Sequence, residues 1–232
     1  MPDNRLKIVV IIPAFNEENS VGKVIADLPV DMITEVVVVN NNSNDNTSVV
    51  ASRAGATVIE EPIAGYGRAC LRGLEYAKNR ADLPDIVVFI DADYSDYPEQ
   101  MPELVNPIAL NIADLVIGSR SMGNRESGSM TFPQRFGNRL ATFLIWHLFK
   151  HKFTDLGPFR AIRYSSLTRL EMEDQDYGWT VEMQVKGIKK GLRCLEVPVD
   201  YRKRIGFSKI SGTVKGTFLA GYKIIRTIFK YA

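Results

Sequence analysis

Short runs of valine and isoleucine alternate with helical patterns through the first half of the chain. Short apolar runs with almost no polar interruption are typical of parallel strands buried on both faces. The alternation predicts an α/β fold: a doubly wound, Rossmann-like, mostly parallel sheet with helices on both faces. The predicted strands are 7–13, 35–40, 57–60, 85–90 and 114–117, and the predicted helices are 20–28, 44–54, 67–78 and 99–110.

The pattern changes after Gly118. Residues 119–131 are rich in glycine, serine and asparagine and are predicted as a loop. The segments that follow are predicted as helix 132–150, strand 159–164, helix 180–189, strand 192–199 and a C-terminal helix over 213–231. No repeat or low-complexity segment divides the chain, so we expect a single domain over 1–232.

Composition excludes several classes of protein. Hydrophobic residues make up 45% of the chain and the net charge is +2, so a core can form and no overall signal for nucleic-acid binding exists. The two cysteines, Cys70 and Cys194, have no spacing typical of zinc or disulfide frameworks, which favours the cytoplasm. The apolar run 8–12 is too short for a signal peptide, and the run 141–149 is too short to span a membrane.

Polar side chains follow four of the predicted strands. They lie in segments 13–18, 40–43, 91–93 and 118–120. Because ligands of open α/β sheets bind at the carboxyl ends of the strands, we expect these four segments to meet at one edge of the sheet.

Asp91 and Asp93 come directly after the apolar run 86–90. Neighbouring carboxylates repel each other unless a cation lies between them, and carboxylate oxygens suit Mg²⁺ or Mn²⁺. A pair of solvated turn aspartates is the alternative. The position directly after a buried strand favours the metal site.

Five motifs occur in a fixed order at these strand ends. They are Pro-Ala-Phe-Asn-Glu-Glu at 13–18, Asn-Asn-Asn-Ser at 40–43, Asp-Ala-Asp-Tyr-Ser-Asp-Tyr-Pro-Glu at 91–99, Gly-Ser-Arg at 118–120 and Arg-Ile-Gly-Phe-Ser-Lys at 204–209. Together they resemble the family-2 glycosyltransferases of GT-A fold. The nearest subgroup is the dolichyl- or polyprenyl-phosphate sugar synthases and their bacterial relatives, and the resemblance spans residues 7 to about 212.

The resemblance implies a nucleotide-sugar-binding half at 1–120, an acceptor-facing half at 121–212 and a C-terminal amphipathic helix at 213–232. It implies that Asp91 and Asp93 hold Mg²⁺ or Mn²⁺, that Asp93 and Arg120 act in catalysis, and that Arg120 and Arg204 lie near phosphates. The residues expected to bind the nucleotide are Pro13, Ala14, Asn16, Glu17, Asn41, Gly67, Arg68, Asp91 and Ala92.

Two positions depart from the family pattern. Many relatives carry Asp-Asp where this chain has Asn40-Asn41, and an amide can donate as well as accept a hydrogen bond. Asn41 therefore fits uracil without specifying it. Ser95 stands where the synthases commonly carry glutamine, so it reaches a metal only through its hydroxyl or a water.

Residues 65–70 imitate a dinucleotide-binding fingerprint, with Gly65, Gly67 and Arg68 at the start of a predicted helix. That fingerprint belongs after the first strand, where this chain has a different sequence. We expect the two glycines to shape a turn near the donor, with Arg68 assisting and the helix N-terminus able to meet a phosphate.

Two carboxylates are candidate general bases. Asp155 precedes the expected acceptor site, and Glu182 occupies the place where hydroxyl-using relatives carry an acidic base. An ion pair with Lys186, four residues later on the same helix, is an equally weighted explanation for Glu182. A lipid-phosphate acceptor would need no base, because its nucleophile is already ionised.

Basic residues gather near the C-terminus. Arg202, Arg204 and Lys209, together with Arg120 and with Arg135 on the predicted helix 132–150, are candidates to bind phosphate or acceptor. The C-terminal helix has an apolar and a basic face, which is typical of a helix on a membrane surface and equally of one docked on the core.

The expected reaction is transfer of a sugar, with inversion, from a nucleotide-diphosphate sugar to a polyprenyl phosphate. UDP-glucose is the first donor expected and GDP-mannose the second. Transfer to a hydroxyl group with Glu182 or Asp155 as base is the alternative. A nucleotidyltransferase, which would need a glycine-rich loop at 13–18, and a non-catalytic binder of nucleotide sugars are less favoured.

Overall fold

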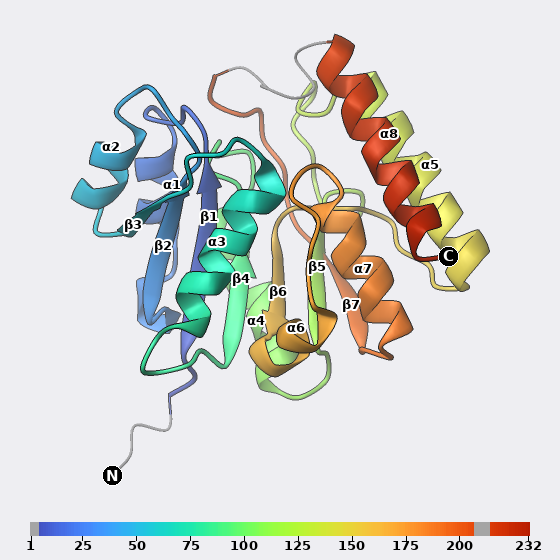
Figure 1. Ribbon diagram of the computed structural model, residues 1–232, viewed down its shortest axis with the longest axis horizontal. Helices are drawn as coiled ribbons and strands as arrows, with labels where there is room; N and C mark the ends of the chain where they lie inside the picture. Colours follow the sequence, from blue (N-terminus) through green and yellow to red (C-terminus); the bar gives the residue numbers. More distant parts are fainter. Residues whose placement is uncertain (1–4, 207–213) are drawn as a thin grey trace.

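The computed structural model describes residues 5–206 and 214–232, which form one seven-stranded sheet flanked by helices (Figure 1). The strand order is β3-β2-β1-β4-β6-β5-β7. The strands are β1 Ile8–Ala14, β2 Glu35–Asn40, β3 Thr57–Glu60, β4 Ile86–Phe89, β5 Leu115–Ser119, β6 Arg160–Arg163 and β7 Cys194–Pro198.

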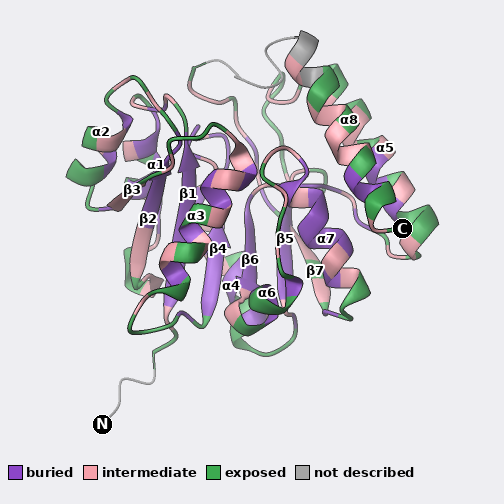
Figure 2. Cartoon of the chain, in the orientation of Figure 1, coloured by how far each residue is buried: buried purple, intermediate pink, exposed green. Residues whose placement is uncertain are grey.

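The helices lie on both faces of this sheet, as predicted. α1, α2 and α4 pack their apolar residues on one face, and α3, α5, α6, α7 and α8 contribute to the core on the other. The strands between these layers are largely buried (Figure 2). The helices are α1 Val21–Asp27, α2 Thr47–Arg53, α3 Tyr66–Lys78, α4 Met101–Ala109, α5 Phe132–Phe149, α6 Tyr164–Leu170, α7 Trp179–Lys189 and α8 Val214–Lys230, with short 3-10 turns at Val30–Met32 and Pro98–Gln100.

β6 is the one strand of this sheet that runs against its neighbours. It lies between β4 and β5 and is antiparallel to both, whereas the other neighbouring strands pair in parallel. β4 and β5 therefore point the same way. The ends of β1, β2, β4 and β5 meet at one edge of the sheet, at the top of Figure 1, which confirms the predicted convergence.

Two details differ from the predicted elements. α6 was not predicted, and the helix expected over 99–110 begins at Met101 because Pro98–Gln100 forms a separate 3-10 turn. The predicted start of the C-terminal helix, Thr213, lies outside the described residues. None of the described helices is both long and apolar enough to cross a membrane.

A glycine sets the distance between α3 and the sheet. A Cβ atom on Gly73 would lie 2.5 Å from a methyl carbon of Ile11 in β1, closer than side chains tolerate. The helix can therefore lie directly on β1 and β2. This close packing brings the first turn of α3 to the carboxyl edge of the sheet, beside the segment that follows β4.

Candidate functional site

Asp93 lies just beyond β4 and is almost completely buried, with 4% of its surface exposed. Its Oδ1 accepts hydrogen bonds from the backbone N–H (2.9 Å) and the hydroxyl (2.5 Å) of Ser95. The Ser95 hydroxyl therefore orients Asp93. The chain turns sharply here, with Tyr94 in the left-handed region at φ 64°.

Asp91 is held differently. The Tyr66 hydroxyl, from the first turn of α3, donates to its Oδ1 over 3.1 Å. Burial, followed by the negative charge of Asp93, raises the pKa of Asp91 from its usual value to about 6. The Asp93 charge thus destabilises the ionised form of Asp91, and a cation between the two carboxylates would relieve the repulsion.

Two arginines approach this carboxylate pair. Nη2 of Arg204 lies 2.7 Å from Oδ2 of Asp93, and the Ile205 N–H donates to the carbonyl oxygen of Asp93 over 2.9 Å. The positive charges of Arg204 and Arg120 both lower the pKa of Asp91, against the effect of burial. The sequence prediction that these residues share one site is consistent with this arrangement.

Arg120 owes its position to Asp155. The fully buried Asp155 carboxylate accepts two bonds from the guanidinium, of 2.8 Å and 2.7 Å, and one from the Arg120 backbone N–H of 2.8 Å. Burial alone would lower the pKa of Arg120, but the Asp155 charge and hydrogen bond hold it well above its usual value. The guanidinium also lies 5.0 Å from the centre of the Tyr201 ring.

The residues at this strand end fit a divalent cation. Among the described residues, no group of three or more histidine, cysteine, aspartate or glutamate side chains could hold a metal alone. Asp91 and Asp93 would supply two carboxylates, and Mg²⁺ typically takes one or two carboxylates together with substrate phosphates and waters. Arg204, which already lies on Asp93, shows that this carboxylate attracts a cation.

The candidate nucleotide-binding residues after β1 hold two loops together. Asn16 adopts a left-handed conformation at φ 53°, donates its backbone N–H to Ser43 Oγ (2.9 Å) and accepts at Oδ1 from the Asn44 N–H (2.9 Å). The Glu17 N–H donates to Thr47 Oγ1 over 2.8 Å. The segments after β1 and β2 therefore form one connected wall.

Asn41 extends this wall to the loop after β3. Its side-chain NH₂ donates to the carbonyl oxygens of Glu61 (3.0 Å) and Ile63 (2.7 Å), and its Oδ1 accepts from the Gly65 N–H (2.8 Å). The two amide hydrogens are thereby used within the protein. An amide oxygen accepts two hydrogen bonds, so Oδ1 keeps one position for a base.

Pro13, Ala14 and Ala92 are buried backbone positions of the same edge. Pro13 and Ala14 end β1 and pair with Val39 and Asn40 of β2. They would contribute to a nucleotide pocket through the shape of the backbone at the end of β1 and after β4.

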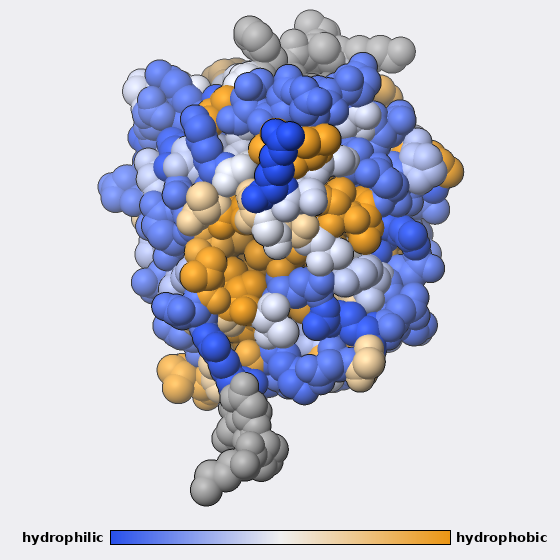
Figure 3. Space-filling view, turned by 90° about the vertical axis from the view of Figure 1, so that its left-hand side faces the viewer, coloured by the Kyte–Doolittle hydropathy of each residue, from blue (hydrophilic) through white to orange (hydrophobic). Residues whose placement is uncertain are grey.

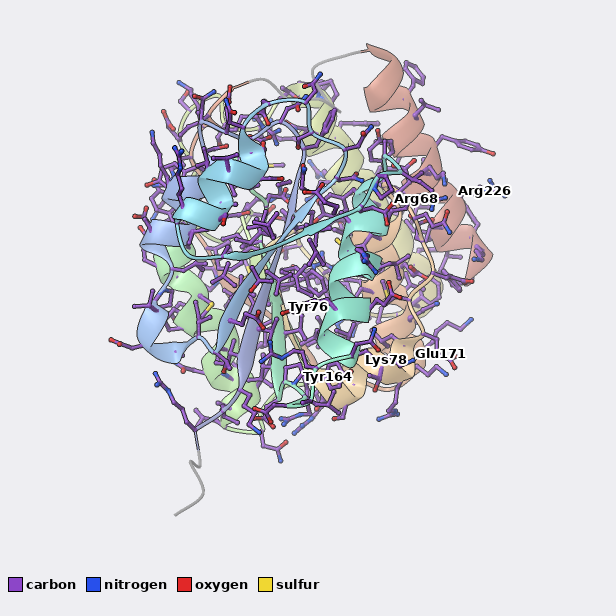
Figure 4. The ribbon with its side chains drawn as sticks, turned by 60° about the vertical axis from the view of Figure 1, so that its left-hand side comes forward. Arg68, Tyr76, Lys78, Tyr164, Glu171 and Arg226 are labelled. Atoms are coloured by element: carbon purple, nitrogen blue, oxygen red, sulfur yellow. The ribbon has the colours of Figure 1, made fainter. Side chains whose placement is uncertain are left out.

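The first turn of α3, at Gly67 and Arg68, packs against the 174–176 segment. The Arg68 N–H donates to the carbonyl oxygen of Gln175 over 3.0 Å. A Cβ atom on Gly67 would lie 2.1 Å from the carbonyl oxygen of Asp174. Gly67 is thus required for close packing of the 174–176 segment. Figure 4 shows Arg68 at the first turn of α3, on the same side as Arg226 of α8.

Glu182 is fully buried and held by several partners. Lys186 lies 2.8 Å from its Oε1, which realises the ion pair weighed from the sequence. The carboxylate also accepts from the Asp174 N–H (2.8 Å) and the Tyr231 hydroxyl (2.9 Å). Glu182 therefore fixes the 173–174 backbone and the end of α8, and this structure favours that role over a general base.

The other basic candidates divide into three cases. Arg202 donates to the carbonyl oxygens of Tyr94 (2.8 Å) and Asp96 (3.2 Å), and it lies 3.4 Å from the centre of the Tyr94 ring. It therefore anchors the segment after β4, and its expected contact with phosphate stays a prediction. Arg135 is exposed on α5. Lys209 lies outside the described residues.

Sequence reasoning did not single out three polar side chains of this region: Tyr66, Asp96 and Arg160. Asp96 is 1% exposed, and no described residue donates a hydrogen bond to either carboxylate oxygen. Burial, followed by the Asp91 charge, raises the pKa of Asp96 well above its usual value. The aspartate of the segment 91–99 was visible in the sequence, but its burial was not.

Arg160 is a fully buried guanidinium in β6. It donates to the carbonyl oxygens of Leu156 (3.1 Å), Gly157 (3.1 Å) and Thr180 (2.8 Å). Burial lowers the pKa of Arg160 to about 10. These bonds fix the segment that follows Asp155 to the first turn of α7, and no sequence signal identifies them.

Comparison with known proteins agrees with this geometry. The profile described as glycosyl transferase family 2 matches residues 9–170. A protein of Mycobacterium tuberculosis described as an uncharacterized glycosyltransferase is 35% identical over 218 residues, covering 92% of this chain and 94% of that protein. A dolichyl-phosphate hexose transferase of Haloferax volcanii is 32% identical over 232 residues, covering 96% and 92%.

Two further similarities extend the comparison. An undecaprenyl-phosphate mannosyltransferase of Micrococcus luteus is 30% identical over 227 residues, covering 91% of this chain and 90% of that protein. The fold matches glucosyl-3-phosphoglycerate synthase from Mycobacterium tuberculosis, solved with Mn²⁺, UDP and phosphoglyceric acid, with a TM-score of 0.79 and 23% identity over 98% and 78% of the two chains. The chain belongs to glycosyl transferase family 2 and is a glycosyltransferase of GT-A fold.

Proposed function

We propose that this glycosyltransferase moves a hexose from a nucleotide-diphosphate sugar to a polyprenyl phosphate. The contacts already made by the two candidate bases, Asp155 and Glu182, are the main support for this proposal. Asp155 is used by Arg120, and Glu182 is used by Lys186 and by backbone N–H groups. A hydroxyl acceptor needs a base within reach of its proton, whereas a phosphate acceptor is already ionised.

Two relatives support this acceptor class. The proteins of Haloferax volcanii and Micrococcus luteus described above carry the names of a dolichyl-phosphate hexose transferase and an undecaprenyl-phosphate mannosyltransferase. Both matches cover at least 90% of each chain. Both names describe transfer to a polyprenyl phosphate.

In the proposed reaction an oxygen of the acceptor phosphate attacks the anomeric carbon from the face opposite the nucleotide. The bond between that carbon and the diphosphate oxygen breaks, the nucleoside diphosphate leaves with the electron pair, and the configuration inverts. Asp91 and Asp93 would hold Mg²⁺ or Mn²⁺, which would neutralise charge on the leaving diphosphate.

The protein's own residues supply the remaining positioning. Arg120 is fixed by Asp155, and its preorganised positive charge favours the ionised form of Asp91. Arg204 lies on Asp93 and adds a second positive charge there. Fixed charges of this kind stabilise a leaving group without reorganising during the reaction.

The donor is proposed in the order UDP-glucose, then GDP-mannose. The free acceptor position of the Asn41 Oδ1 suits the N3–H of uracil. Its two amide hydrogens already bind backbone carbonyls, so they cannot also read a base.

Transfer of radiolabelled sugar to undecaprenyl phosphate in detergent tests the proposal. UDP-glucose and GDP-mannose are offered in turn, each with Mg²⁺, with Mn²⁺ and with a chelator. We expect a labelled lipid with one donor and either metal. Undecaprenol without phosphate is the matched acceptor. Labelling of undecaprenol, or of a sugar hydroxyl in preference to the lipid phosphate, would overturn the proposal.

A further inference from the structure

α5 and α8 expose an unusual number of large apolar side chains. They lie side by side on the right of Figure 1, outside the sheet. Their side chains with at least a third of their surface exposed are Phe132, Phe136, Phe143, Trp146 and Leu148 on α5, and Phe218, Leu219, Tyr222 and Phe229 on α8. Scattered single residues of this kind are normal on a soluble protein, but a concentration of aromatics on two adjacent helices indicates a binding surface.

These aromatic residues follow the helical repeat and pack on one another. The Phe132 and Phe136 rings stack with centres 6.5 Å apart, and the Phe143 and Trp146 rings lie 6.2 Å apart. The inner sides of the same helices are buried at other positions, such as Ile145 on α5. The exposed residues are therefore a second apolar side of the pair, in addition to the side that reaches the core.

α8 leaves part of its apolar surface exposed. Ile228 and Thr227 dock on the core, while Phe218 is 77% exposed and Phe229 is 56% exposed. Docking on the core, one of the two interpretations of this helix from the sequence, therefore describes its buried side. It packs on α5 and α7 on one side and presents aromatics on the other.

The pair carries positive charge and no negative charge. The helices α5 and α8 hold six of the 29 lysines and arginines and none of the 27 acidic residues. Arg135, Arg139 and Arg226 are exposed on the helices, whereas Lys230, near the end of α8, pairs with Glu173. A second copy of this surface would meet it with like charge, whereas an anionic surface would complement it.

The opposite edge of the molecule provides a contrast. The β3 side also shows apolar surface among hydrophilic residues (Figure 3). Val49 and Ile63 are exposed in that region, but Arg53 and Glu60 supply both signs of charge there. Aromatic residues combined with exclusively basic ones are thus a property of the α5–α8 pair.

α5 connects this surface to the catalytic region. The side-chain NH₂ of Asn138 donates to the carbonyl oxygen of Thr154 (3.1 Å), and its Oδ1 accepts from the Leu156 N–H (2.9 Å). These bonds hold the residues on either side of Asp155, which positions Arg120. Direct hydrogen bonds therefore join α5 to the segment that contains Asp155.

We infer that the outer side of the α5–α8 pair binds the surface of an anionic phospholipid bilayer. Aromatic side chains enter the interface between headgroups and acyl chains, and lysine and arginine contact the anionic headgroups. The whole pair is the docking surface, rather than the C-terminal helix alone. The inference stands apart from the donor and acceptor proposed above, although it would deliver a membrane-embedded acceptor to the same site.

Vesicle flotation tests the inference with the full chain and phosphatidylcholine vesicles with or without phosphatidylglycerol. We expect binding that requires phosphatidylglycerol and weakens with salt. The variants Phe136→Ser/Phe143→Ser and Phe218→Ser/Tyr222→Ser should each weaken binding about tenfold. Leu110→Ser/Ile112→Ser is the matched control, because these residues are 71% and 60% exposed away from both helices.

Three results would overturn the inference. Unchanged vesicle binding by the α5 variant would restrict the surface to α8. Equal binding to neutral vesicles would remove the role of charge. A dimer in light scattering that the variants dissociate, without vesicle binding, would assign the face to a second copy. Binding of UDP or GDP by each variant reports on the donor site separately, so failure of the proposed transfer reaction would leave this test intact.

Discussion

Aspartates lie at both ends of the strands, and their pKa values are shifted in opposite directions. One edge of the sheet is where β5 begins, and the other is where β4 ends. Where β5 begins, Asp114 accepts from Arg193 at three nitrogens, over 3.0, 2.9 and 2.7 Å. The hydrogen bond from the Arg193 side chain is the largest cause that lowers the pKa of Asp114 to about 2. Where β4 ends, burial and Asp93 raise the pKa of Asp91 to about 6.

The difference lies in the partners that the fold provides. Asp114 pairs with the guanidinium of Arg193, and the Arg193 backbone N–H also ties Asp114 to the start of β7. Asp91 receives one hydrogen bond from a neutral tyrosine and the repulsion of a second carboxylate. A carboxylate that serves stability is neutralised within the chain. At the other edge Arg204 pairs with Asp93, yet the pKa of Asp91 stays raised, and perturbed carboxylates of this kind are typical of functional sites.

Removing the metal carboxylate should give the largest effect. In Asp93→Ala we expect transfer activity to fall by about a hundredfold or more, because a ligand for the cation and the anchor of Arg204 are both lost. Mn²⁺-dependent binding of nucleotide, measured by calorimetry, should disappear with it. Asp114→Asn is the matched control at the other edge and should keep both. Retained metal-dependent binding in Asp93→Ala would break the comparison.

Asp155 shares features with the aspartates at both edges. It is neutralised like Asp114, yet it serves the catalytic edge by holding Arg120. In Asp155→Asn the buried guanidinium loses its counter-charge, so the free energy of unfolding should fall by about 3 kcal/mol. Urea denaturation measures this change.

Two further variants control this experiment. Glu103→Gln removes an exposed carboxylate in α4 and should change the free energy of unfolding by less than about 0.5 kcal/mol. The double variant Asp155→Asn/Arg120→Gln should lose less stability than the two single changes added together, because neither charge is then left alone. Additive losses would show that the pair does not interact.

Replacing Arg204 separates the effect of this arginine on the carboxylate pair from the effect of a bound metal ion. It lies on Asp93, so in Arg204→Ala the affinity for Mn²⁺ alone should rise by about threefold to tenfold, as a competing positive charge is removed. The affinity for the nucleoside diphosphate with Mn²⁺ should instead fall by about tenfold. Calorimetric titration with each ligand measures the two changes.

Lys203→Ala is the control for Arg204, because the neighbouring lysine is exposed and pairs with Glu126. It should leave both affinities unchanged. If both affinities fell in Arg204→Ala, the arginine would support the carboxylate pair and would not compete with the metal.

The sequence predicted which strand ends meet at the candidate site better than it predicted the hydrogen bonds that hold the site residues in place. Strands Glu35–Asn40 and Thr57–Glu60 appear at the predicted bounds, and the convergence of four strand ends follows from their shared direction. The antiparallel direction of β6 could not be predicted, because an apolar run indicates that a strand is buried but not which way it runs.

The hydrogen bonds that hold the site residues in place were missed because their two partners are distant in sequence. Tyr66 meets Asp91 across 25 positions, and Arg160 reaches Thr180 across 20. For Glu182 the local pair with Lys186 was visible, but the contact with Tyr231, 49 positions away, was not. Periodicity and motif order describe local structure, whereas these bonds depend on the assembled packing.

The smallest expected effects concern pH, and here the two edges should give slopes of opposite sign. The pKa of Asp114 is lower in the folded protein than its usual value, so the stability it adds is present above about pH 4 and lost as pH falls toward 2. Because Asp114 is partly exposed, we expect a contribution of about 1 kcal/mol.

Asp91 should act in the reverse sense. Its pKa is raised in the folded protein, so the unfolded chain ionises first and stability decreases as pH rises from about 4 to 6. Denaturation from pH 2 to 7 should therefore show a flatter slope below pH 4 in Asp114→Asn and a flatter slope between pH 4 and 6 in Asp91→Asn. If both variants lost the same slope, the two edges would not differ in how they hold charge. If each loses only its own, the raised pKa of Asp91 is a cost in stability that the fold carries at neutral pH.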